Sequence, residues 1–517
     1  MINKFLFTLF AAGVAIHASA QKIYNIQKLG AKGDGETSNT LVIQQAINEA
    51  NANGGGIVLV PAGKFVTGVI ELKSNVIIQL AANASLLGST SRIDYGPKSA
   101  SALIVATDQH HIGITGKGII DGQGTELLKD IYRMLNNGTL EDKEWKTENP
   151  WHQLRPEERN RPKIIEFKNC DSITIKGISI KNGLCWIQNY KNCSNMVIDS
   201  IHAESNIMWN NDGIDLTDCK NVRLTNSFFN ADDDGICLKS EDRTRRCENI
   251  YIANCTVRSS ASAVKFGTAS RGGFKNITIR NITVYDTYRS AIAIESVDGG
   301  TLEDVDIRNV KATNTGNAIF IRLGHRNKDS VISKIRRVYI ANVKVITPNT
   351  KPDKGYPMEG PAPDFPHNVF PSSITGLPGH PVEDVVLQNI EMVYPGGANK
   401  DSAYFPLDSL NSIKENAADY PEFSMFGELL AWAFYARHVT GLTLKNITIR
   451  YQKEDFRSAM VFDDINGLKL QTIHVATGKQ MPFIVFNEIK KLTTAGISLP
   501  LQHKGAIRFM KKPNRYQ

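Results

Sequence analysis

The fold of this chain is decided by the segments N-C-S-N-M-V-I-D-S-I-H-A (residues 192–203), D-C-K-N-V-R-L-T-N-S-F-F (218–229) and R-C-E-N-I-Y-I-A-N-C-T-V (246–257). Each holds two short runs in which apolar and polar residues alternate, as they do in strands, with Asn or another turn-forming residue between the runs. Related segments extend from residues 169–180 to near His474. The period is roughly two dozen residues where the repeats are compact, and such self-similarity is typical of a solenoid.

One such unit cannot bury its apolar face alone, whereas a stack of units buries a continuous core. Propeller blades need about forty residues or more per repeat, and leucine-rich repeats would show Leu at fixed places. We therefore predict an all-β protein, a single-stranded right-handed parallel β-helix whose coils lie roughly 4.8 Å apart. Four cysteines occupy the same place in successive repeats, and we expect them to stack as buried thiols. They are Cys170, Cys193, Cys219 and Cys247.

Residues 1–20 have the features of a secretory signal: Lys4, a short apolar run, and H-A-S-A before Gln21. We predict cleavage after Ala20 and export to the periplasm or the extracellular space. Residues 21–517 then form one β-helix domain with an N-terminal cap at about 21–100. Insertions interrupt the repeat at about 125–160, 348–380 and 396–436, and in repeat proteins such insertions gather on one face and form the binding surface.

The composition excludes several classes of function. The formal charge of +8 is spread along the chain without an aromatic-interleaved basic stripe, so nucleic-acid binding is not expected. Beyond the signal, no stretch is long and apolar enough to span a membrane. The odd number of cysteines, seven, argues against a full disulfide framework. No Cys or His pair has zinc spacing, and we expect neither a metal nor another cofactor.

Six aspartates lie between Trp209 and Lys239: Asp212, Asp215, Asp218, Asp232, Asp233 and Asp234. Carboxylates this close repel one another, and a metal site or acid/base chemistry is the usual reason for them. Asp212 and Asp233 stand about one coil apart and can project onto one face. Inverting glycosidases place two carboxyls about 6.5–9.5 Å apart, one to protonate the leaving oxygen and one to activate water. We expect chemistry from Asp212, Asp233 and Asp234, a turn at Asp218 and a buried hydrogen-bonding role for Asp215.

The segments N-N-D-G-I-D (210–215) and A-D-D-D-G-I-C-L-K-S (231–240) resemble the N-T-D-G-I-D and G-D-D-C-I-A-I-K-S motifs of the polygalacturonases, glycoside hydrolase family 28. The segment I-T-G-K-G-I-I-D-G-Q-G (114–124) is also similar to that group. The resemblance implies a β-helix of the pectin lyase type that hydrolyses pectic α-galacturonide links with inversion and without a metal. It makes Asp233 the general acid, while Asp212 and Asp234 hold and deprotonate the water. A register one residue earlier would pair Asp232 with Asp233.

The chain departs from that family where the substrate is held. Ser262 stands where the family has the His of G-H-G, and Ala293-Ile294-Glu295 stands where it has R-I-K. Those basic residues grip a uronate carboxylate, which Glu295 would repel. We therefore expect a neutral sugar on the leaving side, such as rhamnose in rhamnogalacturonan, with basic residues elsewhere holding a carboxylate or forming structural ion pairs. The expected substrate-binding residues are Asn210, Lys239, Ser262, Lys265, Glu295, Arg322 and Arg326.

The sequence thus predicts an O-glycosyl hydrolase acting on a pectic or related polysaccharide. The long insertions favour exo action, since they can close one end of the groove. Two other classes stay open: a β-helix polysaccharide lyase that uses calcium and a basic residue, and a non-catalytic β-helix that only binds carbohydrate. New reducing ends without ultraviolet absorbance would indicate hydrolysis, and an absorbing unsaturated product would indicate a lyase.

Overall fold

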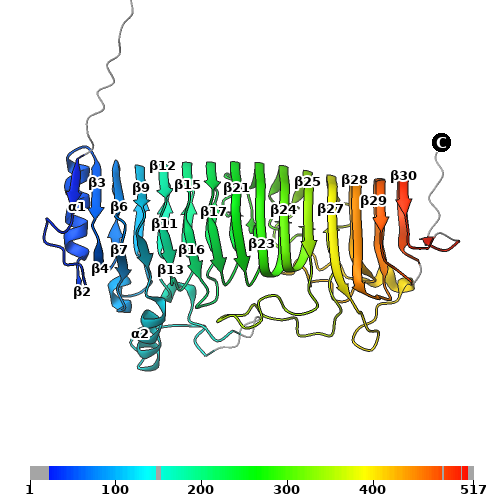
Figure 1. Ribbon diagram of the computed structural model, residues 1–517, viewed down its shortest axis with the longest axis horizontal. Coiled ribbons are helices and arrows are strands. Elements are labelled where there is room, and N and C mark those ends of the chain that lie inside the picture. The colour runs from blue at the N-terminus through cyan, green and yellow to red at the C-terminus, as the bar shows by residue number, and fades with distance from the viewer. Residues whose placement is uncertain (1–21, 147–152, 480–481, 502–503, 511–517) are drawn as a thin grey trace, which may run out of the picture.

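Short alternating segments of the chain form parallel strands that stack coil upon coil into a right-handed β-helix, as predicted (Figure 1). The computed structural model describes residues 22–146, 153–479, 482–501 and 504–510. The expected signal peptide and residues 147–152 of the first insertion lie outside the described residues. None of the helices in the described part of the chain is long and apolar enough to cross a membrane.

Three parallel sheets, called PB1, PB2 and PB3, run along the helix. PB1 contains β5 (Ile70–Glu71), β8 (Ile104–Thr107), β11 (Ile165–Lys168), β14 (Gln188–Lys191), β17 (Ile214–Thr217), β20 (Ile236–Ser240), β22 (Val264–Ser270), β26 (Ser372–Thr375) and β31 (Ile507–Phe509). PB2 contains β1 (Ile23–Asn25), β3 (Gly56–Val60), β6 (Val76–Leu80), β9 (His110–Gly116), β12 (Asp171–Lys176), β15 (Ser194–Asp199) and β18 (Lys220–Thr225). PB3 contains β2 (Asp34–Ser38), β4 (Gly63–Thr67), β7 (Ala84–Gly88), β10 (Ile119–Asp121), β13 (Ser179–Lys181), β16 (His202–Ser205) and β19 (Phe228–Ala231).

Later in the chain the bends are smooth enough that one strand runs through more than one sheet. These strands are β21 (Cys247–Ser259), β23 (Gly273–Ser296), β24 (Thr301–Leu323), β25 (Lys334–Ile346), β27 (Val382–Gly396), β28 (Ala431–Lys453), β29 (Ser458–Val475) and β30 (Ile484–Ser498). The helical elements are α1 (Thr40–Ala52), α2 (Gly124–Asn136), η1 (Arg92–Tyr95), η2 (Glu158–Asn160) and η3 (Leu407–Ser412). Helix α1 lies at the N-terminal end of the stack (Figure 1).

Asparagines at the bend between PB2 and PB3 explain why the repeat turns where it does. Asn254 has φ of +57°, the left-handed conformation that Asn tolerates better than most residues. Its side-chain amide donates to Asn226 at 3.1 Å and its oxygen accepts from Asn281 at 2.9 Å. The same contact repeats from coil to coil through Asn309, Asn342, Asn389 and Asn446. This ladder sets the register of the coils.

The predicted stack of buried thiols is confirmed. Cys170, Cys193, Cys219 and Cys247 are all buried and free. The thiol of Cys219 donates to the carbonyl of Tyr190 at 3.2 Å, and that of Cys247 to the carbonyl of Leu216 at 3.1 Å, each in the preceding coil. Burial raises the pKa of Cys247 to about 12, so these thiols pack and do not react.

The insertion bounds differ from those predicted. Residues 372–375 form PB1 strand β26 and β28 already begins at Ala431, so the loops cover 347–371 and 397–430. Strand β3 pairs with β6 in the stack, which makes the N-terminal cap much shorter than residues 21–100. The Pro- and Gly-rich composition of the loops concealed the short strand β26. All three large insertions precede a PB1 strand, and they therefore lie along one edge of PB1 (Figure 1).

Candidate active site

The strand register brings the aspartates into columns. Ile214 pairs with Ile236, and Ile236 with Val264, so two residues upstream Asp212, Asp234 and Ser262 follow one another in successive coils. The backbone confirms this alignment, since the N–H of Gly213 donates to the carbonyl of Asp234 at 2.9 Å. Carboxylate oxygens of Asp212 and Asp234 lie within 4.8 Å of one another. The register thus pairs Asp212 with Asp234, and not with Asp233 as a register one residue earlier would require.

Asp233 lies in the neighbouring column and faces a cavity of about 250 Å³. One of its carboxylate oxygens accepts the N–H of Asp234 at 3.0 Å, and the other lies 3.4 Å from the amide nitrogen of Asn210. Asp212 and Asp234 are only 3% and 4% exposed and do not line this cavity. The three aspartates therefore separate into one carboxyl that faces the cavity and two that lie together behind it.

Two buried lysines neutralise the aspartates. The Lys239 ammonium lies 2.9 Å from a carboxylate oxygen of Asp212 and 2.5 Å from one of Asp215. Burial raises the pKa of both carboxyls, and the effect on Asp212 is large. Burial alone would lower the pKa of Lys239, but Asp212 and Asp215 raise it well above its usual value. Lys239 therefore stays charged between the two carboxyls that it joins.

Lys265 acts in the same way on Asp234. Its ammonium lies 3.1 Å from one carboxylate oxygen of Asp234 and donates to the Tyr420 hydroxyl at 3.0 Å. The other Asp234 oxygen accepts the N–H of Ser262 at 3.1 Å. Both oxygens of Asp234 thus receive donors, as an ionised carboxylate requires.

Asp212, Asp234 and Cys237 are the one group of the described residues whose ligand atoms lie close enough together to hold a metal. These residues do not fit a cation, because both carboxylates already pair with lysine ammoniums. The Cys237 thiol donates to the carbonyl of Gly267 at 3.1 Å, and burial raises its pKa well above the usual value. A thiol held protonated is a poor ligand.

Comparison with known proteins agrees with this geometry. The model of the glycosyl hydrolases family 28 matches residues 54–353. The chain belongs to family 28. It is 26% identical over 385 residues to an exo-poly-alpha-D-galacturonosidase of Dickeya chrysanthemi (63% of this chain, 62% of the relative) and 25% identical over 315 residues to a probable polygalacturonase of Vitis vinifera (57% and 56%). The matches thus span less than two thirds of these relatives' lengths.

The fold of this family 28 chain is similar to that of an exopolygalacturonase of Thermotoga maritima whose structure is known. The TM-score is 0.56 at 23% identity, and the match covers 72% of this chain and 87% of the other. At this identity the likeness shows the fold only, and the roles of individual residues are argued from their own contacts.

Of the seven expected substrate-binding residues, one lines the cavity, four support the catalytic aspartates and two lie elsewhere. Asn210 lines the cavity, while Ser262 contributes its backbone N–H to Asp234 and Lys239 and Lys265 are occupied by the aspartates. Glu295 is 2% exposed. Burial raises its pKa to about 8, although the charge of Lys265 opposes the rise. Lys239, Ser262, Lys265 and Glu295 thus support the catalytic aspartates and do not line the cavity.

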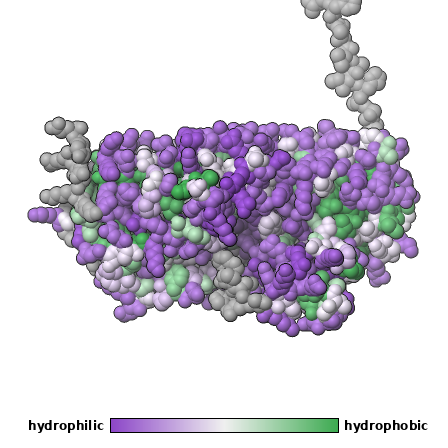
Figure 2. Space-filling view, turned by 180° about the vertical axis from the view of Figure 1, so that it is seen from behind, coloured by the Kyte–Doolittle hydropathy of each residue, from purple (hydrophilic) through white to green (hydrophobic). Residues whose placement is uncertain are grey.

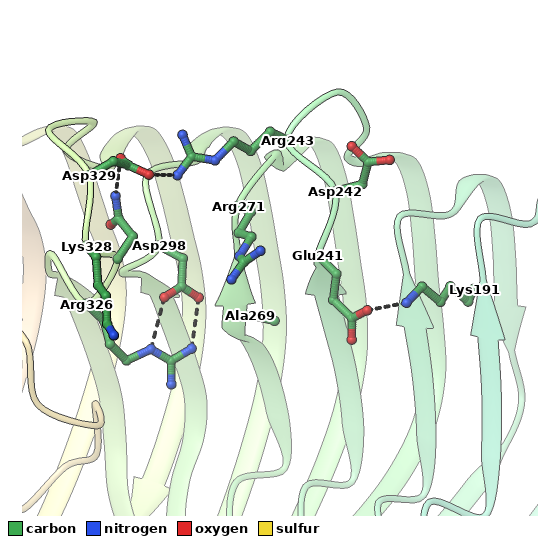
Figure 3. A pocket seen from close by; sticks show the side chains of 11 residues that line it. Lys191, Glu241, Asp242, Arg243, Ala269, Arg271, Asp298, Arg326, Lys328 and Asp329 are labelled. Carbon is green, nitrogen blue, oxygen red and sulfur yellow. Dashed lines mark hydrogen bonds and ion pairs between the residues drawn. The ribbon is translucent and has the colours of Figure 1, made fainter.

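The structure does not bring Arg322 and Arg326 into the cavity. Arg322 is fully buried and donates to the carbonyls of Gly376, at 3.2 Å, and Glu415. Arg326 binds Asp298 through two hydrogen bonds of 2.9 Å in a separate cavity of about 1210 Å³ (Figure 3). The prediction that Arg322 contacts substrate is wrong, because its side chain is fully buried and bound to carbonyl groups of the fold away from the cavity. Arg322 therefore has the structural role that was the alternative.

Sequence reasoning missed the cationic residues that do line the cavity, Arg155 and Arg289. Arg289 lies in the Asp233 column two coils further on. Ile236 pairs with Val264 and Val264 with Ile292, so the residues three positions upstream, Asp233, Ala261 and Arg289, follow one another. The period alone could have placed it. Arg155 and Tyr420 come from the first and third insertions, where no repeat constrains position, so the sequence held no comparable signal.

Proposed function

We propose that this chain hydrolyses α-linked galacturonosyl bonds in pectic oligosaccharides or polysaccharides, with inversion at the anomeric carbon. The observation that carries the proposal is the division of the three aspartates, with Asp233 facing a cavity and Asp212 and Asp234 paired behind it. The relatives are named as an exo-poly-alpha-D-galacturonosidase and a probable polygalacturonase, and these names support the same reaction.

In the proposed reaction Asp233 gives its proton to the glycosidic oxygen as the bond from that oxygen to the anomeric carbon breaks. A water held by Asp212 and Asp234 attacks the same carbon from the opposite face and loses its proton to one of these carboxylates. Lys265 lies 3.1 Å from Asp234 and compensates the negative charge of that carboxylate. The chemistry needs no step at a metal, and the two lysines do the charge compensation.

We further propose exo action. The cavity wall is built from all three insertions: Gln153 and Arg155 of the first, Gly360 and Pro361 of the second and Tyr420 of the third. Walls on several sides suit a chain end better than a continuous polymer. Figure 2 shows the face seen from behind as largely hydrophilic and hollowed near its middle, as a sugar-binding surface would be. Release of single sugars from long chains would support exo action, and a rapid fall in viscosity would contradict it.

The expected preference for rhamnogalacturonan rested on Glu295 repelling a carboxylate. Glu295 is buried, and its pKa of about 8 leaves it largely uncharged at neutral pH, next to the positive charge of Lys265. That argument therefore no longer favours a neutral leaving sugar over galacturonate. Parallel assays on rhamnogalacturonan and polygalacturonate oligomers decide between the two substrates.

The test of the reaction is Asp233→Asn. We expect turnover of galacturonide oligomers to fall at least about a hundredfold with unchanged folding, because the proton donor is lost. Asp242→Asn is the matched control, since Asp242 is an exposed aspartate whose contacts are to its own turn. Nuclear magnetic resonance of the first-formed product reports its anomeric configuration. Retained turnover in Asp233→Asn, or an unsaturated product from the wild type, would overturn the proposal.

We also propose that the chain is exported to the periplasm or beyond the cell. The support is the A-x-A-like end of residues 1–20 and the size of the polymeric substrate. Amino-terminal sequencing of the protein recovered outside the cytoplasm should begin at Gln21, and an intact Met1 would contradict export by this route.

A further inference from the structure

Arg155 has donors that nothing in the described part of the chain uses. Its Nε and Nη1 atoms are buried and have no hydrogen-bond partner there, although the residue lines the cavity beside Asp233. Burial lowers the pKa of this guanidinium, and the nearby charge of Arg161 lowers it further. Leaving a charged donor buried and unpaired is costly, so such a group usually awaits a ligand.

The backbone around Arg155 is held firmly. Arg161 is 1% exposed, and its Nε donates to the carbonyl of Pro156 at 2.9 Å, next to Arg155 in the chain. Its Nη2 donates at 2.9 Å to the side chain of Asn210, whose amide faces Asp233. The first insertion is thereby attached to the coil that carries the catalytic motif. Arg155 is presented to the cavity by a fixed segment, as a recognition residue must be.

No carboxylate in the described part of the chain forms an ion pair with Arg155. Glu158 and Asp233 line the same cavity and are attracted to it, but no ion pair joins either to Arg155. Asp232 also lines the cavity, and burial together with the charge of Asp233 raises the pKa of its carboxyl well above the usual value. The other cavity cation, Arg289, lies 3.4 Å from Glu422. Among the described residues that line the cavity, Arg155 is thus a cation without an ion pair.

We propose that Arg155 binds the carboxylate of the uronic acid whose glycosidic bond is cleaved, so that the substrate must end in a free uronate and not in its methyl ester. The inference rests on the proposed function, since it concerns the sugar beside Asp233. Guanidinium presents parallel N–H donors that match the two oxygens of a carboxylate, and a planar ester offers neither the charge nor the second anionic oxygen. Arg155 is then a specificity-determining residue that the repeat does not encode.

The experiment compares Arg155→Gln with wild type on α-1,4-linked trigalacturonate and on its methyl ester. We expect kcat/KM on the free acid to fall by about tenfold to a hundredfold, mostly through KM, while the low activity on the ester stays unchanged. Arg159→Gln is the matched control, because Arg159 lies in the same insertion, is partly exposed and pairs with Glu157 away from the cavity. Arg155→Lys keeps the charge without the fork and should fall between the two.

Calorimetric binding of monomeric galacturonate and galactose separates this inference from the reaction itself. Tighter binding of galacturonate that is lost in Arg155→Gln, in a wild type that hydrolyses nothing, would support Arg155 and sink the proposed hydrolysis. Equal losses on acid and ester, or no loss on either, would overturn the role of Arg155 and leave the reaction standing. Thermal unfolding of each variant guards against misfolding, and a folded Arg155→Lys still tests the proposal if Arg155→Gln does not fold.

Discussion

Replacing Lys265 by Met tests the charge arrangement behind the cavity. The Lys265 ammonium is 2% exposed, lies 3.1 Å from Asp234 and is attracted to Glu295 as well. Lys265→Met keeps most of the side-chain volume but leaves the buried Asp234 carboxylate without its ammonium. Removing one partner of a buried ion pair costs about 3–5 kcal/mol of folding free energy. We also expect kcat to fall, because the Asp234 carboxylate that holds the attacking water loses its counter-ion.

Urea unfolding and steady-state kinetics measure the two effects separately. Because Glu295 is largely uncharged at neutral pH, the double variant Lys265→Met/Glu295→Gln should regain neither stability nor activity. A fall in unfolding free energy below about 1 kcal/mol together with normal kcat would show that Lys265 is not the counter-ion of Asp234. Rescue of activity in the double variant would point to Glu295, and not Asp234, as the group that matters.

Two further predictions concern buried charges. Because the pKa of Glu295 is about 8 in the folded protein against 4.5 when exposed, the folded state binds this proton more tightly. Its stabilisation is complete below about pH 4.5 and is lost as the pH rises through 8, at up to about 1.4 kcal/mol per pH unit, so Glu295→Gln should flatten urea-unfolding stability over that window. Arg322→Met should lower the unfolding free energy by about 1–3 kcal/mol and leave KM unchanged, since its hydrogen bonds go to carbonyls of the fold; a raised KM in a stable variant would restore it as a binding residue.

The β-helix could be predicted from sequence because its physics is periodic. The bend residue, the inward alternation and the cysteine stack all recur coil by coil, and Asn254 takes its ladder contacts from Asn226 and Asn281 at fixed intervals. The catalytic column follows from the same period. The period alone did not show which aspartates lie side by side. The strand register decides this, and it places Asp212 against Asp234. What could not be predicted comes from the insertions, where chain direction is set by contacts such as those of Arg161 and not by a repeat.

The difference between repeating coils and insertions also explains why the sequence predicted the wrong positions for residues that bind the substrate carboxylate. Sequence comparison looks for a lost basic residue at its own position, as at Glu295, and finds a charge of the opposite sign there. In the structure Glu295 lies behind the cavity, where it is attracted to Lys265. The guanidinium of Arg155, with its unpaired Nε and Nη1, belongs to a non-repeating loop. A solenoid allows this separation, because its coils fix the acid and base while the loops before PB1 vary without disturbing them. The aligned residues of successive coils therefore indicate the chemistry of the site, and the insertions indicate its specificity.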